Sequence, residues 1–210
     1  MKITLPLPVE KFRRQLLHMM HHANMKTSHS YIFGGCVRDF LMRKEPKDYD
    51  IILGHPTRDI KVLLRRAGIV YEEKPRSSHI FLDIEGYEVQ MMEKLIVEYD
   101  FTINKFRASL DDLVIEGPEA SYHDLRHKLL RAIDISPRMF RRCIYMLYKY
   151  PSFRPTPETL YELKRCVCNE EQIKSFIVKK QMKNEAFLAV CNQYGLASKA
   201  SFLAVSMKDF

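Results

Sequence analysis

The spacing of apolar residues changes twice along the first hundred positions. Over residues 9–24 the apolar side chains recur every three or four positions, which predicts an amphipathic helix. The next patterns come in a fixed order along the chain: a short apolar run, a glycine pair, a strongly apolar run and a second helical pattern. These patterns predict strands at 31–33 and 49–54 and helices at 36–43 and 57–67.

Two alternating runs follow, at 79–84 and 87–92. Glu85 and Gly86 separate them, and two residues of this type predict a tight β-hairpin turn. From about residue 121 the strand patterns stop and helical patterns succeed one another, with prolines between some of them. The helices are predicted at 121–132, 137–149, 157–168, 170–182 and 185–194.

This order predicts an α+β fold with a change of character near residue 120. Residues 1–120 are expected to form a head with a small mixed sheet and helices, and residues 121–210 a helical lobe. With 210 residues, 46% of them hydrophobic, the chain is long enough to bury a core, and nothing in its composition indicates a disordered or fibrous protein.

The sequence shows no pattern typical of a membrane span, a disulfide framework or a histidine or cysteine metal site. No apolar run is long enough to span a bilayer, and prolines and charges interrupt the start of the chain, so a cytoplasmic location is expected. Five scattered cysteines indicate reduced thiols instead of a structural zinc site. His18 and His22 lie one helical turn apart, but no further ligand is near in sequence, which favours a polar helix face over a metal site.

Positive charge is concentrated in the second part of the chain. Residues 1–125 hold 18 Lys and Arg against 19 Asp and Glu, a net charge of −1, whereas residues 126–210 hold 16 against 7, a net charge of +9. Such a density is typical of proteins that bind a phosphate-rich partner. A solvated helix face is the alternative reading of the charge alone.

Glycines and carboxylates come together in residues 34–50. Gly34 and Gly35 stand between a strand and a helix, where backbone can approach a phosphate without a Cβ atom in the way. Asp48 and Asp50 are two positions apart on a predicted strand and so share one face, an arrangement that suits a magnesium ion. The alternative is that Asp48 caps a turn and Asp50 is simply exposed.

The whole segment GGCVRDFLMRKEPKDYDIIL at 34–53 resembles the signature of the nucleotidyltransferase superfamily that includes DNA polymerase β. Within it, the segment is similar to class II CCA-adding enzymes and bacterial poly(A) polymerases. DFTIN at 100–104 looks like a second motif of that family, which helps to position the nucleotide sugar, and DLRHKLLRAI at 124–133 looks like the segment that closes its head. Asp124 therefore has a place in the pattern and need not form a metal-hydrolase dyad with His123.

The resemblance implies a polymerase β-like head followed by a helical neck and shortened body, and it implies roles for individual residues. Asp48 and Asp50 would bind magnesium and activate an RNA 3′ hydroxyl. The resemblance and the basic charge of the second part of the chain together make Arg142 and Lys149 candidates for contact with acceptor phosphates. Glu88 is a candidate third carboxylate, with a half-exposed strand residue as the alternative. The implied nucleotide-binding residues are Gly34, Gly35, Arg38, Asp39, Asp100, Asn104, Arg138 and Arg141.

Two departures from the family pattern bear on the nucleotide. Glu98 and Tyr99 stand where the family has two arginines, and Asp134 and Ile135 stand where it has the Glu-Asp pair whose Asp helps to select the base. Isoleucine has no hydrogen-bonding side chain, so C-then-A selection is not expected.

These observations lead to one hypothesis with two alternatives. The hypothesis is a magnesium-dependent nucleotidyltransferase that moves a nucleotide from ATP or another nucleoside triphosphate to the 3′ end of a tRNA or other RNA. The alternatives are a minimal nucleotidyltransferase with a non-RNA or protein acceptor, and a catalytically weak RNA-binding module on the same fold.

Overall fold

The computed structural model describes residues 7–73, 79–84, 86–93, 99–112, 114–134, 136–201 and 203. Its contacts divide the chain into two compact units, each taken by itself below. The first contains Met1–Tyr99 and Ile103–Tyr122, and the second contains Asp100–Thr102 and His123–Phe210.

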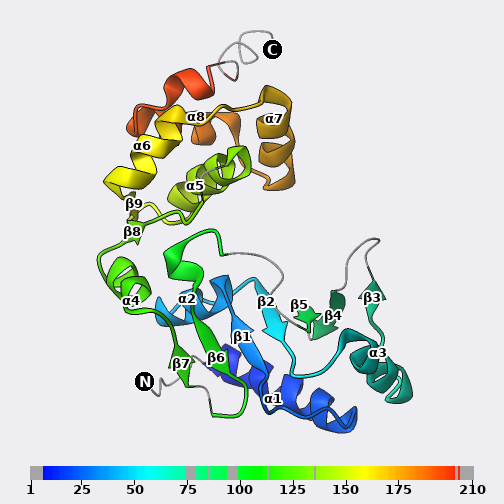
Figure 1. The fold of residues 1–210 in the computed structure, drawn as a ribbon. Helices are drawn as coiled ribbons and strands as arrows, with labels where there is room; N and C mark the ends of the chain where they lie inside the picture. Colours follow the sequence, from blue (N-terminus) through cyan, green and yellow to red (C-terminus); the bar gives the residue numbers. More distant parts are fainter. Residues whose placement is uncertain are drawn as a thin grey trace. The chain divides into compact units, whose positions relative to one another are not determined.

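The first unit is built on a seven-stranded sheet in the order β3-β4-β5-β2-β1-β6-β7 (Figure 1). The central pair β2 and β5 is parallel, and the other paired strands are antiparallel. The mixed sheet confirms the predicted α+β class. The strands are β1 (Tyr31–Phe33), β2 (Asp48–Ile52), β3 (Glu72–Glu73), β4 (Ile80–Ile84), β5 (Tyr87–Met92), β6 (Arg107–Ser109) and β7 (Ile115–Glu116).

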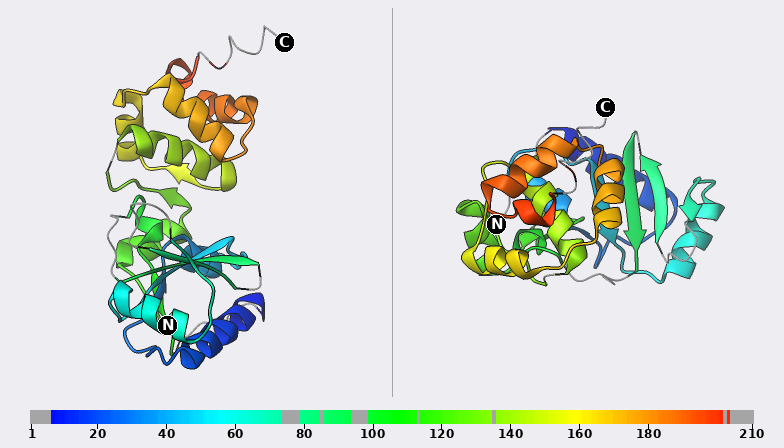
Figure 2. Two further views of the ribbon diagram at one scale, coloured as in Figure 1. Left: turned by 90° about the vertical axis from the view of Figure 1, so that its right-hand side faces the viewer. Right: turned by 90° about the horizontal axis from the view of Figure 1, so that it is seen from above.

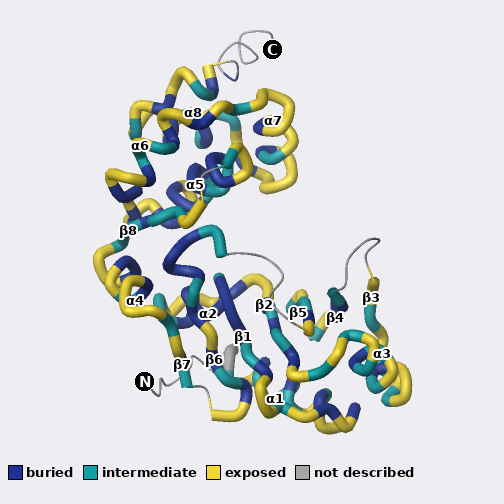
Figure 3. Tube along the Cα trace, in the orientation of Figure 1, coloured by how far each residue is buried: buried dark blue, intermediate teal, exposed yellow. Residues whose placement is uncertain are grey.

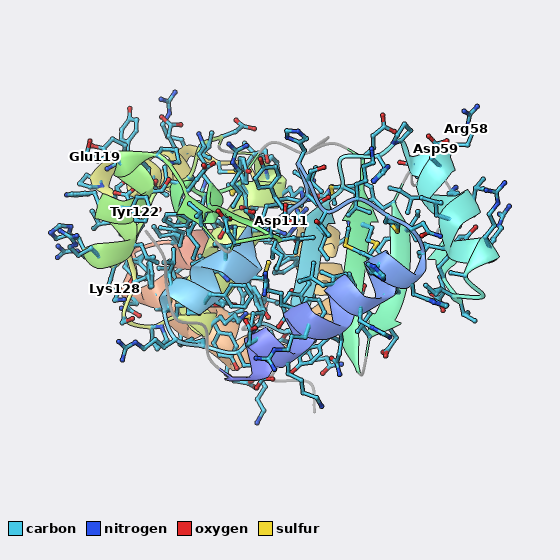
Figure 4. All side chains as sticks on the ribbon, turned by 90° about the horizontal axis from the view of Figure 1, so that it is seen from below. Arg58, Asp59, Asp111, Glu119, Tyr122 and Lys128 are labelled. Carbon is cyan, nitrogen blue, oxygen red and sulfur yellow. The ribbon has the colours of Figure 1, made fainter. Side chains whose placement is uncertain are left out.

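Helix α3 (Thr57–Arg66) lies beside the sheet edge that β3 and β4 form (Figures 1 and 2). Lys61 of α3 donates to Glu73 of β3 over 2.6 Å, which ties the helix to that edge. At the first turn of α3, Arg58 and Asp59 point away from the unit (Figure 4), and the Arg58 side chain is 91% exposed.

Helices α1 (Leu7–His22) and α2 (Gly35–Leu41) cover one face of the sheet, and in Figure 4 they lie in front of its strands. The ring of Phe12 stacks on Tyr49 of β2, with 3.6 Å between centroids and 17° between planes, and Phe40 of α2 approaches the same tyrosine. Phe12 and Tyr49 are fully buried. The core of the unit therefore lies between these helices and this face of the sheet.

The predicted hairpin is confirmed by the pairing of β4 with β5. Ile84 lies opposite Tyr87, so two residues connect the strands. Gly86 has a φ of 87°, in the left-handed region that favours glycine, and Asp83 accepts a hydrogen bond from its backbone N–H. Glu85 lies outside the described residues.

The helices from residue 119 onward confirm the helical character of the second half of the chain. Ser136, Thr156 and Asn169 each cap one of the middle three by accepting from a backbone N–H three residues on. The helices are α4 (Glu119–Arg126), α5 (Pro137–Lys149), α6 (Pro157–Arg165), α7 (Glu170–Lys179) and α8 (Asn184–Gln193), followed by a short 3-10 helix at Ala197–Lys199.

The prediction of one helix over 121–132 is wrong. Helix α4 ends at Arg126, Lys128 adopts a left-handed φ of 56°, and Leu129–Leu130 forms strand β8. Strand β8 pairs in parallel with β9 (Arg154–Pro155). The helical lobe thus contains a two-stranded connection that holds its first segment against the loop before α6.

The first part of the DFTIN segment belongs to the second unit. Phe101 pairs with Ala132 as an isolated antiparallel bridge, and the buried carboxylate of Asp124 accepts from Thr102 over 2.7 Å and from Arg131 over 3.0 Å. Burial alone would raise the pKa of Asp124, but the hydrogen bonds from Arg131 and Thr102 outweigh it and place the pKa below its ordinary value.

Among the described residues, no helix has the length and apolar character that crossing a membrane would require.

We expect Asp124→Asn to lower the free energy of unfolding by about 1–3 kcal/mol at neutral pH, because a buried charge-assisted network loses its acceptor. A lowered carboxyl pKa stabilises the fold above the unfolded-state pKa of about 4, and this contribution disappears as the pH falls through the folded-state pKa. The difference between the wild type and the variant should therefore shrink in acid. Denaturation followed by far-ultraviolet circular dichroism measures both effects, with the exposed Asp134→Asn as control. A difference that does not change with pH would contradict this account.

Candidate active site

Strand β2 presents its two carboxylates on the face opposite the helices. Tyr49 and Ile51 are fully buried, whereas Asp48 is exposed and Asp50 is half-buried. Because side chains alternate along a strand, Asp48 and Asp50 share the other face, as their spacing predicts. The tight packing of Tyr49 against Phe12 holds this orientation.

Gly34 lies next to Asp50. Phe33 of β1 is the register partner of Asp50, and a Cβ atom placed on Gly34 would lie 3.8 Å from Asp50 Oδ2. Gly34 has a φ of 79°, which side chains rarely adopt, and its N–H donates to the carbonyl of Phe106. Glycine is therefore suited to this position, because it adopts the required φ and has no side chain to occupy the space beside the Asp50 carboxylate.

Cys36 is a thiol close enough to this pair of acids to feel their charge. It is buried, its Sγ donates to the carbonyl of Phe33, and burial together with the negative charge of Asp50 raises its pKa far above the usual range. Cys36 therefore remains neutral, and oxygen atoms are the anionic ligands that this site offers.

Glu88 lies beside Asp48 in the sheet. The two residues are register partners on the parallel strands β2 and β5, which places them on the same face, and Glu88 is exposed. No set of three or more His, Cys, Asp and Glu side chains could hold a metal ion in the part of the chain that the structure describes. The role of Glu88 as a third catalytic carboxylate stays a prediction.

Arg38 is buried instead of facing solvent. It is 4% exposed, its Nε and Nη2 donate to Asp39 Oδ1, and its Nη1 donates to Asn104 over 2.6 Å. A Cβ atom on Gly35 would lie 3.3 Å from Nη2 of Arg38. The structure thus joins three predicted nucleotide-binding residues into one network, and their contact with a phosphate or sugar stays a prediction.

The remaining predicted residues lie in the second unit. Arg138 is exposed on α5, and Arg141, half-buried, donates to Gln172 of α7 over 2.6 Å. Lys149 is exposed at the end of α5, where its Nζ lies 5.1 Å from the centre of the Tyr150 ring. The predicted roles of these cations toward nucleotide and RNA are not tested by the geometry of this unit alone.

One pairing was missed by the sequence. Arg142 of α5 forms an ion pair with Asp100, and its Nε lies 2.6 Å from Asp100 Oδ2. The two residues are 42 positions apart, and their opposite charges are the only sequence feature that could have suggested an ion pair. A residue predicted to meet RNA and one predicted to meet the nucleotide thus bind each other in this structure.

The departures from the family pattern are only partly visible. Tyr99 is half-buried, and burial raises the pKa of its hydroxyl. Glu98 and Ile135 lie outside the described residues, while Asp134 is exposed directly before Ile135. The base-selecting role assigned to position 135 stays a prediction.

Comparison with known proteins finds a matching family model and curated relatives. Residues 30–95 match the poly(A) polymerase head domain. The chain is 30% identical over 78 residues to poly(A) polymerase I of Haemophilus influenzae, covering 37% of this chain and 17% of the relative. It is 27% identical over 123 residues to the CC-adding tRNA nucleotidyltransferase of Shouchella clausii, covering 56% of this chain and 32% of the relative.

The fold extends the likeness beyond the matched residues. A solved tRNA-processing enzyme in its apo form superimposes with a TM-score of 0.72 at 20% identity, covering 95% of this chain and 60% of that one. The chain thus spans less than a third of either curated relative and three fifths of this structure. Residues 30–95, which contain β1, α2 and β2, thus match the poly(A) polymerase head domain in sequence, and the likeness to the tRNA-processing enzyme is one of fold.

Proposed function

We propose that the protein is a nucleotidyltransferase that moves a nucleotide from a nucleoside triphosphate to the 3′ end of an RNA, with tRNA as the first acceptor to test. The observation that carries this proposal is the pair Asp48 and Asp50 on the face of β2 away from the helices, with Gly34 directly beside Asp50. The similarity to poly(A) polymerase I and to a CC-adding tRNA nucleotidyltransferase supports the same reaction class.

The donor set of this site fits a magnesium ion. Asp48 and Asp50 supply carboxylate oxygens, and Mg²⁺ in nucleotide sites is usually held by one or two carboxylates together with substrate phosphates and water. A bound Mg²⁺ would neutralise phosphate charge and lower the pKa of an attacking hydroxyl. Without a cation, the two acids would repel both each other and the triphosphate.

The protein's own groups have distinct tasks in this proposal. Asp48 and Asp50 hold the cation, and the bare backbone at Gly34 lets phosphate oxygens approach Asp50. Arg38 acts as a positioning residue, because its guanidinium joins α2 to Asn104 and so fixes the glycine segment relative to the second motif. Arg138 and Arg141 are proposed to contact the nucleotide, and Lys149 the acceptor phosphates.

The acceptor is the part of the proposal that needs a direct experiment. The protein is incubated with magnesium, each labelled nucleoside triphosphate in turn and total RNA, and the labelled products are sized and sequenced. Labelled RNA 3′ ends are the expected result. Labelled protein or small molecules would favour the minimal transferase, and no metal-dependent incorporation would favour the RNA-binding module.

The cytoplasmic location also stays a prediction.

We expect Asp48→Asn and Asp50→Asn each to reduce transfer more than about 100-fold, since each removes a metal-binding charge with little change in volume. Asp59→Asn on the outer side of α3 is the matched control and should transfer normally. Far-ultraviolet circular dichroism verifies the fold of all three. Transfer within about threefold of the wild type, on the order of 0.7 kcal/mol in barrier, would rule out the metal assignment.

Base choice gives a separate prediction. If Ile135 stands in the place of the base-reading Asp, the site lacks one hydrogen-bonding partner, and the enzyme should discriminate poorly between bases or have a preference other than C-then-A. The measurement is kcat/KM for the four triphosphates on one acceptor, with Ile135→Asp as the test of the cause. Ordered C, C, A addition by the wild type would show that the role assigned to Ile135 is wrong.

A further inference from the structure

The outer sides of α5 and α7 meet along a line of basic and aromatic residues. Arg141 of α5 donates to Gln172 of α7. Tyr145, one turn further along α5, contacts Phe176 of α7 and Lys180, which directly follows α7. Because the residues on each helix are four apart, each set forms a stripe along one side of its helix. With Tyr148 added, these residues are here named the α5–α7 ridge: Arg141, Tyr145, Tyr148, Gln172, Phe176 and Lys180.

Two tyrosines give the ridge aromatic surface that faces solvent. Tyr148 is 45% exposed although it is a large side chain, and its ring centre lies 6.5 Å from that of the half-buried Tyr145. Lys180 lies 5.2 Å from the centre of the Tyr145 ring. Much of α7 is exposed in Figure 3, so the ridge lies at the surface of the second unit.

The charge of the ridge selects its partner. Arg141 and Lys180 are cations, the ridge contains no acidic residue, and residues 126–210 carry a net charge of +9. An apolar protein partner would not require this charge, whereas a single-stranded nucleic acid needs cations for its phosphates and aromatic rings for its bases. A duplex hides its bases and would leave the tyrosines without a partner.

We propose that the α5–α7 ridge binds single-stranded RNA, with a base stacked on Tyr148 and a phosphate held by Lys180. The proposal deepens the proposed function and rests on it, since it gives the RNA acceptor a surface. It reaches beyond the nucleotide-binding arginines, because Tyr145, Tyr148 and Lys180 have no role in nucleotide transfer as derived above.

The test measures binding of a single-stranded uridine oligonucleotide of about 12 nucleotides, a typical site size for such surfaces, without magnesium or nucleotide. Tyr148→Ala is expected to weaken binding about 5- to 100-fold, whereas Tyr148→Phe should bind like the wild type, because stacking needs only the ring. The matched control is Tyr161→Ala on α6. Tyr161 is 59% exposed and also lies beside a cation, Arg165, but outside the ridge.

The cation of the ridge is tested through salt. Lys180→Gln should reduce the slope of log affinity against log salt concentration by about 0.7, the value for one phosphate contact on a single strand. Lys174→Gln is the control on the same helix, since Lys174 pairs with Glu170. Crosslinking with a thiouridine-containing oligonucleotide should label peptides that contain Tyr145 or Tyr148.

Several outcomes would overturn the proposal. These are equal losses in Tyr148→Ala and Tyr161→Ala, equally tight binding of a duplex of the same length, and unchanged binding in Tyr148→Ala. Repeating the oligonucleotide-binding assay with Asp50→Asn separates this proposal from the proposed function, because this variant removes a proposed metal-binding charge and leaves the ridge unchanged. A Tyr148 effect that persists while no acceptor is ever extended would leave the ridge standing and remove the transferase. Transfer to RNA without any effect of Tyr148→Ala on binding would support the transferase and rule out the ridge as an RNA-binding surface.

Discussion

The burial of Tyr49 is the constraint on which the site depends. Its ring is stacked on Phe12 and surrounded by Phe40 and Tyr87, all on the side of the sheet that α1 and α2 cover. A shift of β2 by one residue would exchange the two faces and place two carboxylates in this aromatic core. The free-energy cost of burying unpaired charges makes such a register inaccessible. The aromatic packing therefore orients Asp48 and Asp50 without touching either.

Arg38 shows a second kind of organisation, in which a charge is buried to connect segments. Its guanidinium donates to Asp39 on its own helix and to Asn104, 66 positions away, and both partners are buried. Such a pair contributes little net stability, because desolvation offsets the attraction, but removing one partner leaves an uncompensated charge. The gain is geometric: the glycine segment and the end of the DFTIN motif cannot move independently while the network is intact.

The sequence predicted those elements whose pattern is long or whose turn chemistry is specific. The alternating runs around Gly86, the amphipathic α1 and the capped α5 are of this kind, and so is the shared face of Asp48 and Asp50. Strands β8 and β9 have two residues each and so no period to detect. The left-handed Lys128, two residues beyond the end of α4, has no local signal in the sequence. The Asp100–Arg142 ion pair and the burial of Arg38 depend on residues distant in sequence, which single-chain patterns do not specify.

In the proposed function, the two parts of the chain contribute differently to the attraction of a polyanion. Residues 1–125 have a net charge of −1 and hold the two acids, so this part alone has no long-range attraction for RNA or a triphosphate. Residues 126–210, with a net charge of +9, supply that attraction, which at physiological salt extends over roughly 8 Å. Several of their cations are already engaged: Arg131 binds Asp124 and Arg142 binds Asp100. In the proposed function, exposed cations such as Arg138 and Lys149 would contribute to the attraction for phosphate, because a phosphate can displace the water around an exposed side chain.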